Sequence, residues 1–330
     1  MKPDNLENFN IKKYNPSQKN LWDSFVKEAK NATFLFQRDF MDYHSDRFTD
    51  HSLLVFKGEK LVAVLPANIS GSELHSHQGL SYGGLVLSKK CTFPETLAIF
   101  KNVLAFLNRE GVAVLKLKLI PKIYHQLPSD EIDYLLFLTQ ASLTRRDITS
   151  CVNNENSLKI KSSNRLRGIK KGVKNELEVK EEAKFKAYWN EVLEPNLMQV
   201  HNQKPVHSSA EIELLQSRFP ENIKQFNVYK DDEIVAGATI FETSNLAHAQ
   251  YISANEIGRQ TGGLDFLFNH LLEHFSHKKY FDFGIVNEEQ GEKVNKGLLH
   301  WKETFGGRSI THDFYEVKTE NYELLNDIFI

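Results

Sequence analysis

Two stretches of the chain share one arrangement of apolar and polar positions. Residues 53–67 read LLVFKGEKLVAVLPA, and residues 226–240 read FNVYKDDEIVAGATI. In both, a V-aromatic-K motif is followed after three residues by an L/I-V-A motif. An apolar run, a tight polar turn and a second apolar run predict a β-hairpin. The two stretches therefore predict two hairpins of the same design.

The segments that follow the hairpins also repeat in the same order. After the first come GLSYGGLVL, a helical FPETLAIFKNVLAFLNREG and the strand VAVLKLKLI; after the second come LAHAQYISA, a helical LDFLFNHLLEHFSH and the strand YFDFGIV. The second helix has an apolar stripe made of Leu264, Leu267, Phe268, Leu271, Leu272 and Phe275. Matching segments lie about 170 residues apart, which indicates a duplicated α/β unit. We predict domains at 1–155 and 156–330, divided in the polar segment NNENS.

Composition is typical of an ordinary globular protein. The chain has 330 residues, of which 41% are hydrophobic and 25% charged, and its net charge is −2. A charge so close to zero excludes a general polyanion-binding protein, so any anion site must be local. Cys91 and Cys151 have neither disulfide-framework nor metal-site spacing. Without an apolar signal core or a bilayer-spanning run, we expect a cytoplasmic protein with no transmembrane segment.

A strongly basic segment lies just after the predicted division. KIKSSNRLRGIKKGVK, residues 159–174, has seven lysines and arginines and no acid. Ser162 or Ser163 can cap a helix that begins at Asn164. At about 100° per residue, one face of this helix is apolar and consists of Leu166, Ile169 and Val173. The opposite face is basic.

Like charges four residues apart repel within a helix, so stability alone does not favour this basic face. A bound anion would explain it: a nucleotide-linked diphosphate, the tRNA backbone or an anionic lipid head group. The alternative is a solvated basic surface. The residues that we assign to an anionic substrate or partner are Arg165, Arg167, Lys170 and Lys171.

The stretch YFDFGIVNEEQGEKVNKGLLHWKETFGG, residues 280–307, predicts a buried strand, a polar loop and a short helix that ends at two glycines. The helix has a narrow apolar arc made of Val294, Leu298, Trp301 and Phe305. Lys302 projects at the edge of this arc, so it either extends its ammonium into water or carries its charge into a cleft. Asn287 and Glu288 follow the strand, where α/β folds often form sites, and Glu288 could accept a proton there.

The order of these elements resembles the GNAT acyltransferase fold, and two copies in one chain resemble the Fem-type (FemAB-like) aminoacyl and peptidyl transferase family. The resemblance covers nearly the whole chain and is most specific at TFLFQRDFMDYH, SNRLRGIKKGVKNELEV and FDFG…KGLLHWKETFGG. It implies an α/β (α+β) fold of two tandem GNAT-like domains, each a mixed, mostly antiparallel sheet flanked by helices. It places the active cleft in the second domain, Lys302 near the reacting carbonyl and Trp301 at the substrate.

The resemblance leaves the donor open. In GNAT folds the pyrophosphate of coenzyme A binds at a helix N-terminus after the fourth strand. NEIGRQTGGLDFL fits that pattern at Arg259 and Gly262, and Gly263 adds freedom, but Leu264 departs from it. Fem-type relatives use aminoacyl-tRNA instead, so the co-substrate is acyl-CoA or aminoacyl-tRNA, with no tightly bound cofactor. The first copy lacks the glycines, so we expect no donor site there.

Three further positions are candidates. Tyr82 precedes two glycines that allow close approach of a ligand, and we predict that it lines the substrate cleft. His207 lies in a predicted loop and could act as a general base. His75 and His77 would share one side of an extended segment, but no third ligand is evident, so we predict no metal site.

We therefore predict an acyltransferase in which an acceptor amine attacks an aminoacyl ester or thioester directly, in a ternary complex. By resemblance, the acceptor is a cell-wall (peptidoglycan) precursor or another amine-bearing metabolite. One alternative is a coenzyme A-dependent N-acetyltransferase of a small molecule or protein. Another is a non-catalytic protein that binds tRNA or an anionic membrane surface. The candidate catalytic residues are Lys302, His207 and Glu288.

Overall fold

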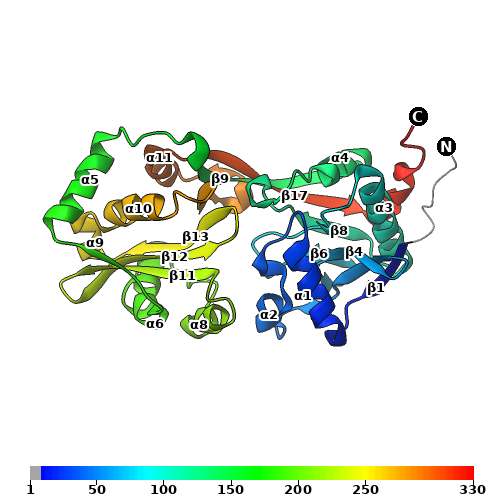
Figure 1. Ribbon diagram of the computed structural model, residues 1–330, viewed down its shortest axis with the longest axis horizontal. Helices are drawn as coiled ribbons and strands as arrows, with labels where there is room; N and C mark the ends of the chain where they lie inside the picture. Colours follow the sequence, from blue (N-terminus) through cyan, green and yellow to red (C-terminus); the bar gives the residue numbers. More distant parts are fainter. Residues whose placement is uncertain (1–8) are drawn as a thin grey trace. The chain divides into compact units, whose positions relative to one another are not determined.

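The computed structural model describes residues 9–330, which form two compact units (Figure 1). The first unit contains the described residues up to Arg146 together with Thr311–Ile330, and the second contains Asp147–Ile310. The predicted division at residue 155 differs from this partition. Residues 311–330 belong to the first unit because their strand pairs there, and residues 147–155 belong to the second for the same reason.

The first unit has two groups of strands. One is a sheet in the order β1 (Phe9–Lys13), β3 (Leu53–Lys57), β4 (Lys60–Leu65) and β7 (Val86–Leu87). The other has the order β17 (Arg308–Lys318), β8 (Val114–Lys118), β6 (Glu73–Ser76), β5 (Asn68–Ser70) and β2 (Thr49–Asp50). The predicted first hairpin is confirmed, since β3 and β4 pair in antiparallel fashion from Leu53↔Leu65 to Lys57↔Lys60.

The helices of the first unit are α1 (Lys19–Glu28), α2 (Arg38–Met41), α3 (Phe93–Arg109) and α4 (Glu131–Leu138). Helix α3 begins after Thr92, because Thr92 and Glu95 form a capping box. Its apolar face is fully buried and includes Ile99, Phe100 and Leu104, which belong to the core that β3, β4 and β8 share.

The second unit repeats this plan. Its strands run in the order β10 (Glu178–Glu181), β11 (Ile223–Lys230), β12 (Glu233–Glu242), β13 (Leu246–Ala254), β14 (Tyr280–Ile285) and β9 (Ser142–Asn153). Strands β15 (Asn287–Glu288) and β16 (Lys293–Val294) form a small separate hairpin. The predicted second hairpin is confirmed by the antiparallel pairing of β11 with β12.

The helices of the second unit are α5 (Ser163–Lys174), α6 (Phe185–Tyr188), α7 (Glu194–His201), α8 (Ser209–Arg218), α9 (Glu256–Thr261), α10 (Gly263–His274) and α11 (Lys296–Thr304). Figure 1 shows α10 on one face of β11, β12 and β13, and α6 and α8 on the other. Helix α10 buries Leu267, Phe268 and Leu271 against these strands, as its apolar stripe predicts. Across residues 9–330, no helix combines the length and apolar character that crossing a membrane requires.

In each unit, two neighbouring strands are parallel over only a short length. Strand β13 pairs with β14 from Leu246↔Tyr280 to His248↔Asp282, and β6 pairs with β8 from Glu73↔Val114 to Ser76↔Leu117. Strand β13 then continues to Ala254 and β14 to Ile285 beyond the last parallel pair. The second unit therefore contains a wedge that begins at His248 and Asp282.

Each unit is completed by a strand that follows the other unit's last helix. Strand β9 follows α4 of the first unit but pairs with β14 of the second, for example at Asp282↔Cys151. Strand β17 follows α11 of the second unit but pairs with β8 of the first, for example at Val317↔Leu115. The duplicated units have thus exchanged their final strands.

This exchange predicts which part of the molecule responds to a substitution in β17. Val317 is fully buried in the core of the first unit. Val317→Asp should lower the free energy of unfolding by about 3 kcal/mol or more, because it buries an unpaired carboxylate. Hydrogen-exchange mass spectrometry should show the loss of protection in β3, β4 and α3. Lys318→Asp, an equal change at an exposed neighbour, is the control. A loss confined to β11–β13 would contradict the exchange.

Candidate active site

Lys302 lies on α11 and is buried beside the end of β14. The residue is 2% exposed, and its Nζ donates hydrogen bonds to the carbonyl oxygens of Gly284 at 2.8 Å and Ile285 at 2.9 Å. Burial lowers the pKa of Lys302 to about 8, and the negative charge of Asp282 opposes part of that change. The interpretation in which the ammonium extends into water is therefore wrong.

Asp282 is a buried carboxylate on β14, two residues before Gly284. Its Oδ1 accepts hydrogen bonds from the hydroxyl of Thr149 and, at 3.0 Å, from the N–H of Gly284. Its Oδ2 lies 2.8 Å from Nδ1 of His248. Burial alone raises the pKa of this carboxyl, but the charge of protonated His248 and the three hydrogen bonds outweigh it and lower the pKa to about 2. Asp282 is therefore ionised at neutral pH.

His248 lies on β13 at the last parallel pair, where the wedge begins. Because an ionised carboxylate only accepts hydrogen bonds, Nδ1 of His248 carries the proton that it shares with Asp282. The side chain keeps 19% of its surface exposed. Sequence reasoning missed His248, because in the alternating segment LAHAQYISA it resembles a solvent-facing position of a strand. His248 lies beside Asp282 because of the register between β13 and β14. The two residues are more than 30 positions apart in the sequence, so no local pattern brings them together.

Gly284 joins these groups. Its φ of +81° is a left-handed conformation that favours glycine, and it directs the N–H to Asp282 and the carbonyl to Lys302. A Cβ at this position would lie 3.5 Å from Cε1 of His248, so Gly284 adjoins that edge of the imidazole. A base, a cation and an ionised carboxylate thus surround one glycine at the start of the wedge.

The thiol nearest this cluster is not suited to covalent catalysis. Cys151 pairs with Asp282 across β9 and β14 and is buried. Burial, together with the charge of Asp282, raises the pKa of the Cys151 thiol well above its ordinary value. A thiolate nucleophile at Cys151 is therefore disfavoured at neutral pH.

The predicted pyrophosphate loop packs against α5. Gly262 links α9 to α10 with a φ of +83°, and a Cβ there would overlap the carbonyl oxygen of Gly168 on α5. Gly263 is less tightly enclosed, since a Cβ would lie 3.1 Å from the carbonyl oxygen of Gly258 and a small shift could admit it. Arg259 donates from Nη1 to Asn196 Oδ1 and to the Ala254 carbonyl, both at 2.8 Å. Gly262 is therefore required for helix packing.

A carboxylate occupies the first turn of α10. Asp265 forms an ion pair with Arg165 of α5, and its Oδ1 accepts a hydrogen bond from Trp301 Nε1 at 3.1 Å. The ring of Trp301 also packs on Phe268, Phe283 and Phe305. Arg165 and Trp301, which we predicted to bind substrate, thus connect α5 and α11 to α10. Their role toward a substrate stays a prediction.

Helix α5 begins as expected but packs through a different face. Ser162 accepts the N–H of Arg165 as the cap. The predicted apolar face is largely exposed, since Leu166 is 42% and Val173 is 62% exposed. The helix instead approaches α10 through Gly168 and Gly172, where a Cβ would meet Asp265 and Phe266 (Figure 1). The glycines allow a close approach that leucine or valine would prevent. Arg167, Lys170 and Lys171 are exposed.

The remaining candidates of the second unit have structural partners. His207 is 6% exposed and lies with Nδ1 2.6 Å from the hydroxyl of Tyr251, which belongs to β13. Asn287 accepts the N–H of Ile148 at 2.6 Å and so connects β9 to the loop after β14. Glu288 is exposed and accepts a hydrogen bond from Asn295 at 2.9 Å. The catalytic roles of His207 and Glu288 stay predictions.

Tyr82 belongs to the first unit and lies in its interior. It is 5% exposed, its hydroxyl is 3.0 Å from Thr33 Oγ1, and its ring packs on Phe36 and Tyr124. The role of Tyr82 in a substrate cleft stays a prediction.

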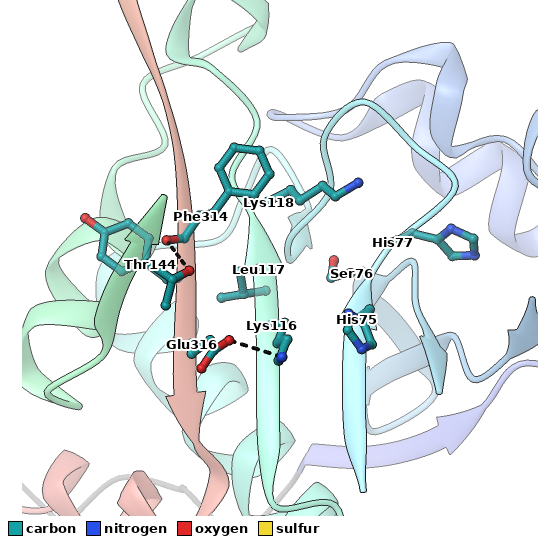
Figure 2. A pocket seen from close by; sticks show the side chains of 10 residues that line it. His75, Ser76, His77, Lys116, Leu117, Lys118, Thr144, Phe314 and Glu316 are labelled. Atoms are coloured by element: carbon teal, nitrogen blue, oxygen red, sulfur yellow. Dashed lines mark hydrogen bonds and ion pairs between the residues drawn. The ribbon is translucent and has the colours of Figure 1, made fainter. Parts of the chain in front are cut away.

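A pocket lies in the first unit, over β6, β8 and β17 (Figure 2). Figure 2 shows Lys116 joined to Glu316 on the neighbouring strand, at 3.1 Å, and His75 beside Lys116. Lys118 donates from Nζ to the carbonyl oxygens of Gln78 and Leu80. Burial, helped by the charge of Arg145, lowers the pKa of Lys118 to about 8. The first unit thus has a half-buried lysine that, like Lys302, donates to two backbone carbonyl oxygens.

The two histidines of the pocket have different environments. His75 lies 3.4 Å from Glu73, and burial lowers its pKa. His77 is buried and stacks on His44 with ring centroids 5.7 Å apart, and burial lowers its pKa to about 3. Both histidines are therefore mainly neutral at neutral pH.

The low pKa of Asp282 predicts a specific loss of stability in acid. The carboxyl has a pKa of about 2 in the folded chain and an ordinary value near 3.8, so its contribution is present above about pH 4 and disappears as the pH falls toward 2. Asp282→Asn cannot ionise and lacks this contribution. The difference in unfolding free energy between the two proteins should shrink by roughly 2 kcal/mol between pH 5 and pH 2.5. Urea denaturation of both proteins across this pH range measures the difference in unfolding free energy. A difference that stays constant would contradict the low pKa of Asp282.

Comparisons with known proteins identify the fold. No protein-family model matches the sequence, and no curated protein matches it either. Among solved structures, FemX is similar with a TM-score of 0.66 and 9% identity, over 96% of this chain and 99% of FemX. The C-terminal domain of a putative lysylphosphatidylglycerol synthetase from Agrobacterium fabrum gives 0.61 and 12%, over 93% and 94%. L-PGS from Bacillus licheniformis gives 0.59 and 10%, over 94% and 93%. The chain therefore has the Fem-like tandem GNAT acyltransferase fold.

Proposed function

We propose that the chain is an aminoacyltransferase, which moves an aminoacyl group from the ester of an aminoacyl-tRNA to an acceptor amine. The observation that carries this proposal is the buried ammonium of Lys302 at the wedge between β13 and β14. A fold shared with FemX supports the reaction class, and the name of the Agrobacterium fabrum protein contains a lysyl group joined to a lipid. An aminoacyl group is therefore the natural choice over acetyl.

In this reaction the acceptor nitrogen attacks the ester carbonyl, the new C–N bond forms and the C–O bond to the tRNA ribose breaks. Negative charge develops on the carbonyl oxygen. The ammonium of Lys302 uses two of its three N–H groups on backbone carbonyls, which fixes the charge in a buried position. A fixed charge of low solvation stabilises an oxyanion far more than a solvated lysine would.

The packing of α5 supports an aminoacyl ester over coenzyme A. The helix N-terminus that would receive a pyrophosphate is α10, and its first turn already holds the carboxylate of Asp265. The carbonyl oxygen of Gly168 fills the space beside Gly262. A diphosphate there would meet the negative charge of the Asp265 carboxylate and the partial negative charge of the Gly168 carbonyl oxygen. The exposed basic surface of α5 is a better contact for a phosphate chain.

The outer face of α5 supports contact with the tRNA backbone. Arg165 is neutralised by Asp265, whereas Arg167, Lys170, Lys171 and Lys174 are exposed and face no acid within the helix. A row of exposed cations binds a phosphate backbone by releasing counterions, which makes the affinity salt-dependent. For the acceptor, we retain an amine of a cell-wall precursor or of a smaller metabolite.

The charge of Lys302 predicts an alkaline limit of activity. Its pKa is about 8, so the ammonium disappears as the pH rises through that value, and kcat/KM for aminoacyl transfer should fall above about pH 8. Lys302→Met keeps most of the stem but should lower kcat by about 100- to 1,000-fold and abolish this limb. The assay follows transfer from charged tRNA to a UDP-linked muropeptide and to small amines.

A matched control exists in the first unit. Lys118→Met removes a half-buried lysine whose pKa is also about 8 and should leave the alkaline limb in place. An active Lys302→Met protein with an unchanged pH profile would contradict the role of Lys302. Transfer from acetyl-CoA, without transfer from charged tRNA, would contradict the donor.

Charge reversal on α5 tests the carrier contact separately. The double variant Arg167→Glu/Lys171→Glu should lower tRNA affinity at least tenfold at low salt and flatten its salt dependence, because it removes phosphate contacts. Lys186→Glu/Lys204→Glu, at two exposed lysines of the same unit, is the control and should bind normally. Filter binding across a salt series measures both. Equal affinity in the two double variants would exclude α5 as the contact.

A further inference from the structure

His248 and Asp282 form a hydrogen-bonded pair that the sequence patterns did not indicate. Asp282 lies on β14 and is 2% exposed, while His248 lies on β13 and keeps 19% of its side-chain surface exposed. The acid is therefore enclosed and the imidazole reaches the wedge. This difference in burial is what a positioned base requires, because only one member of the pair has to meet a substrate.

The partners of Asp282 fix the pair in one orientation. Thr149 of β9 and the N–H of Gly284 both donate to Oδ1, which leaves Oδ2 for His248. With the carboxylate ionised, Nδ1 of His248 must donate to Oδ2, so any neutral form of the ring keeps its proton on Nδ1. Nε2 is then the basic nitrogen, on the side of the ring away from Asp282.

Gly284 places this base beside Lys302. The same residue accepts the ammonium of Lys302 at its carbonyl oxygen and lies next to Cε1 of the imidazole. Cε1 is bonded to both ring nitrogens, so Nε2 lies next to the edge of the ring that faces Gly284. A single carbonyl carbon held here could then carry its oxyanion near Lys302 and be attacked by a nitrogen near His248.

We propose that His248 is a catalytic base of the transfer, with Asp282 and Thr149 as positioning residues. The inference rests on the proposed aminoacyl transfer. Nε2 takes a proton from the acceptor nitrogen as the C–N bond forms, and the resulting imidazolium gives that proton to the ribose oxygen as the C–O bond breaks. Protons and electrons balance within the two substrates. The acceptor class is a primary amine that must lose a proton to complete the amide.

A choice of acceptors separates this role from a structural one. Loss of a general base should lower transfer to an alkylamine by about 100-fold or more. Hydroxylamine is largely unprotonated at neutral pH and depends less on a base. His248→Asn should therefore lose transfer to an alkylamine but retain transfer to hydroxylamine within about threefold of the wild-type rate. His270→Asn, at an exposed histidine of α10, is the control.

Three outcomes of this assay have distinct meanings. Selective loss toward the alkylamine supports the base. Equal loss toward both acceptors, or no loss, overturns it. A wild-type chain that transfers to neither acceptor contradicts the proposed function, and the state of the imidazole then has to be read directly.

Nitrogen chemical shifts of His248 give that direct reading without turnover. Nuclear magnetic resonance of the full chain should show the neutral ring protonated at Nδ1. Asp282→Asn and Thr149→Val should change this tautomer population, whereas His270→Asn should not. A wild-type ring protonated at Nε2 would overturn the inference, whether or not the chain transfers an aminoacyl group.

Discussion

The carboxylate of Asp282 holds three strands together at the point where they begin to separate. It accepts hydrogen bonds from β13 through His248, from β9 through Thr149 and from its own strand through Gly284. A buried charge is costly unless such bonds satisfy it, so the wedge can open here only because the carboxylate is paired on both oxygens. The parallel pairing ends at this residue, and the ammonium of Lys302 lies just beyond it. The remainder of the site is arranged around that one group.

Local patterns predicted the parts of the fold that depend on local chemistry. Both hairpins, the helix α3 and the apolar stripe of α10 are present. The exchange of β9 and β17 was not predicted, because strand pairing between distant segments leaves no periodic signal in either segment. The prediction of which face of α5 packs against the unit was wrong for a related reason. Leucine and valine suggested a buried stripe, but Gly168 and Gly172 make the closer contact with α10.

The candidate site likewise combines a residue that a local sequence pattern predicted with residues that only distant strand pairing brings together. Lys302 was identified because it lies in WKETFGG, where an aromatic residue and a lysine are followed, after two residues, by Phe-Gly, as in the Fem-type resemblance. The sequence did not reveal that the lysine is buried. Asp282 appeared only as one letter of the strand FDFG, and His248 as a polar position in an alternating strand. Their meeting depends on the register His248↔Asp282.

The exchange of final strands sets an order on folding during synthesis. The partner strand of β14 is β9, which is made before β14, so the second unit has all of its strands as soon as β14 and α11 have left the ribosome. The partner strand of β8 is β17, which is made only after the entire second unit. One edge of the first unit therefore stays unpaired while all of that intervening chain is translated, and unpaired edges invite association with other chains. The unit that begins first is the one that must finish last.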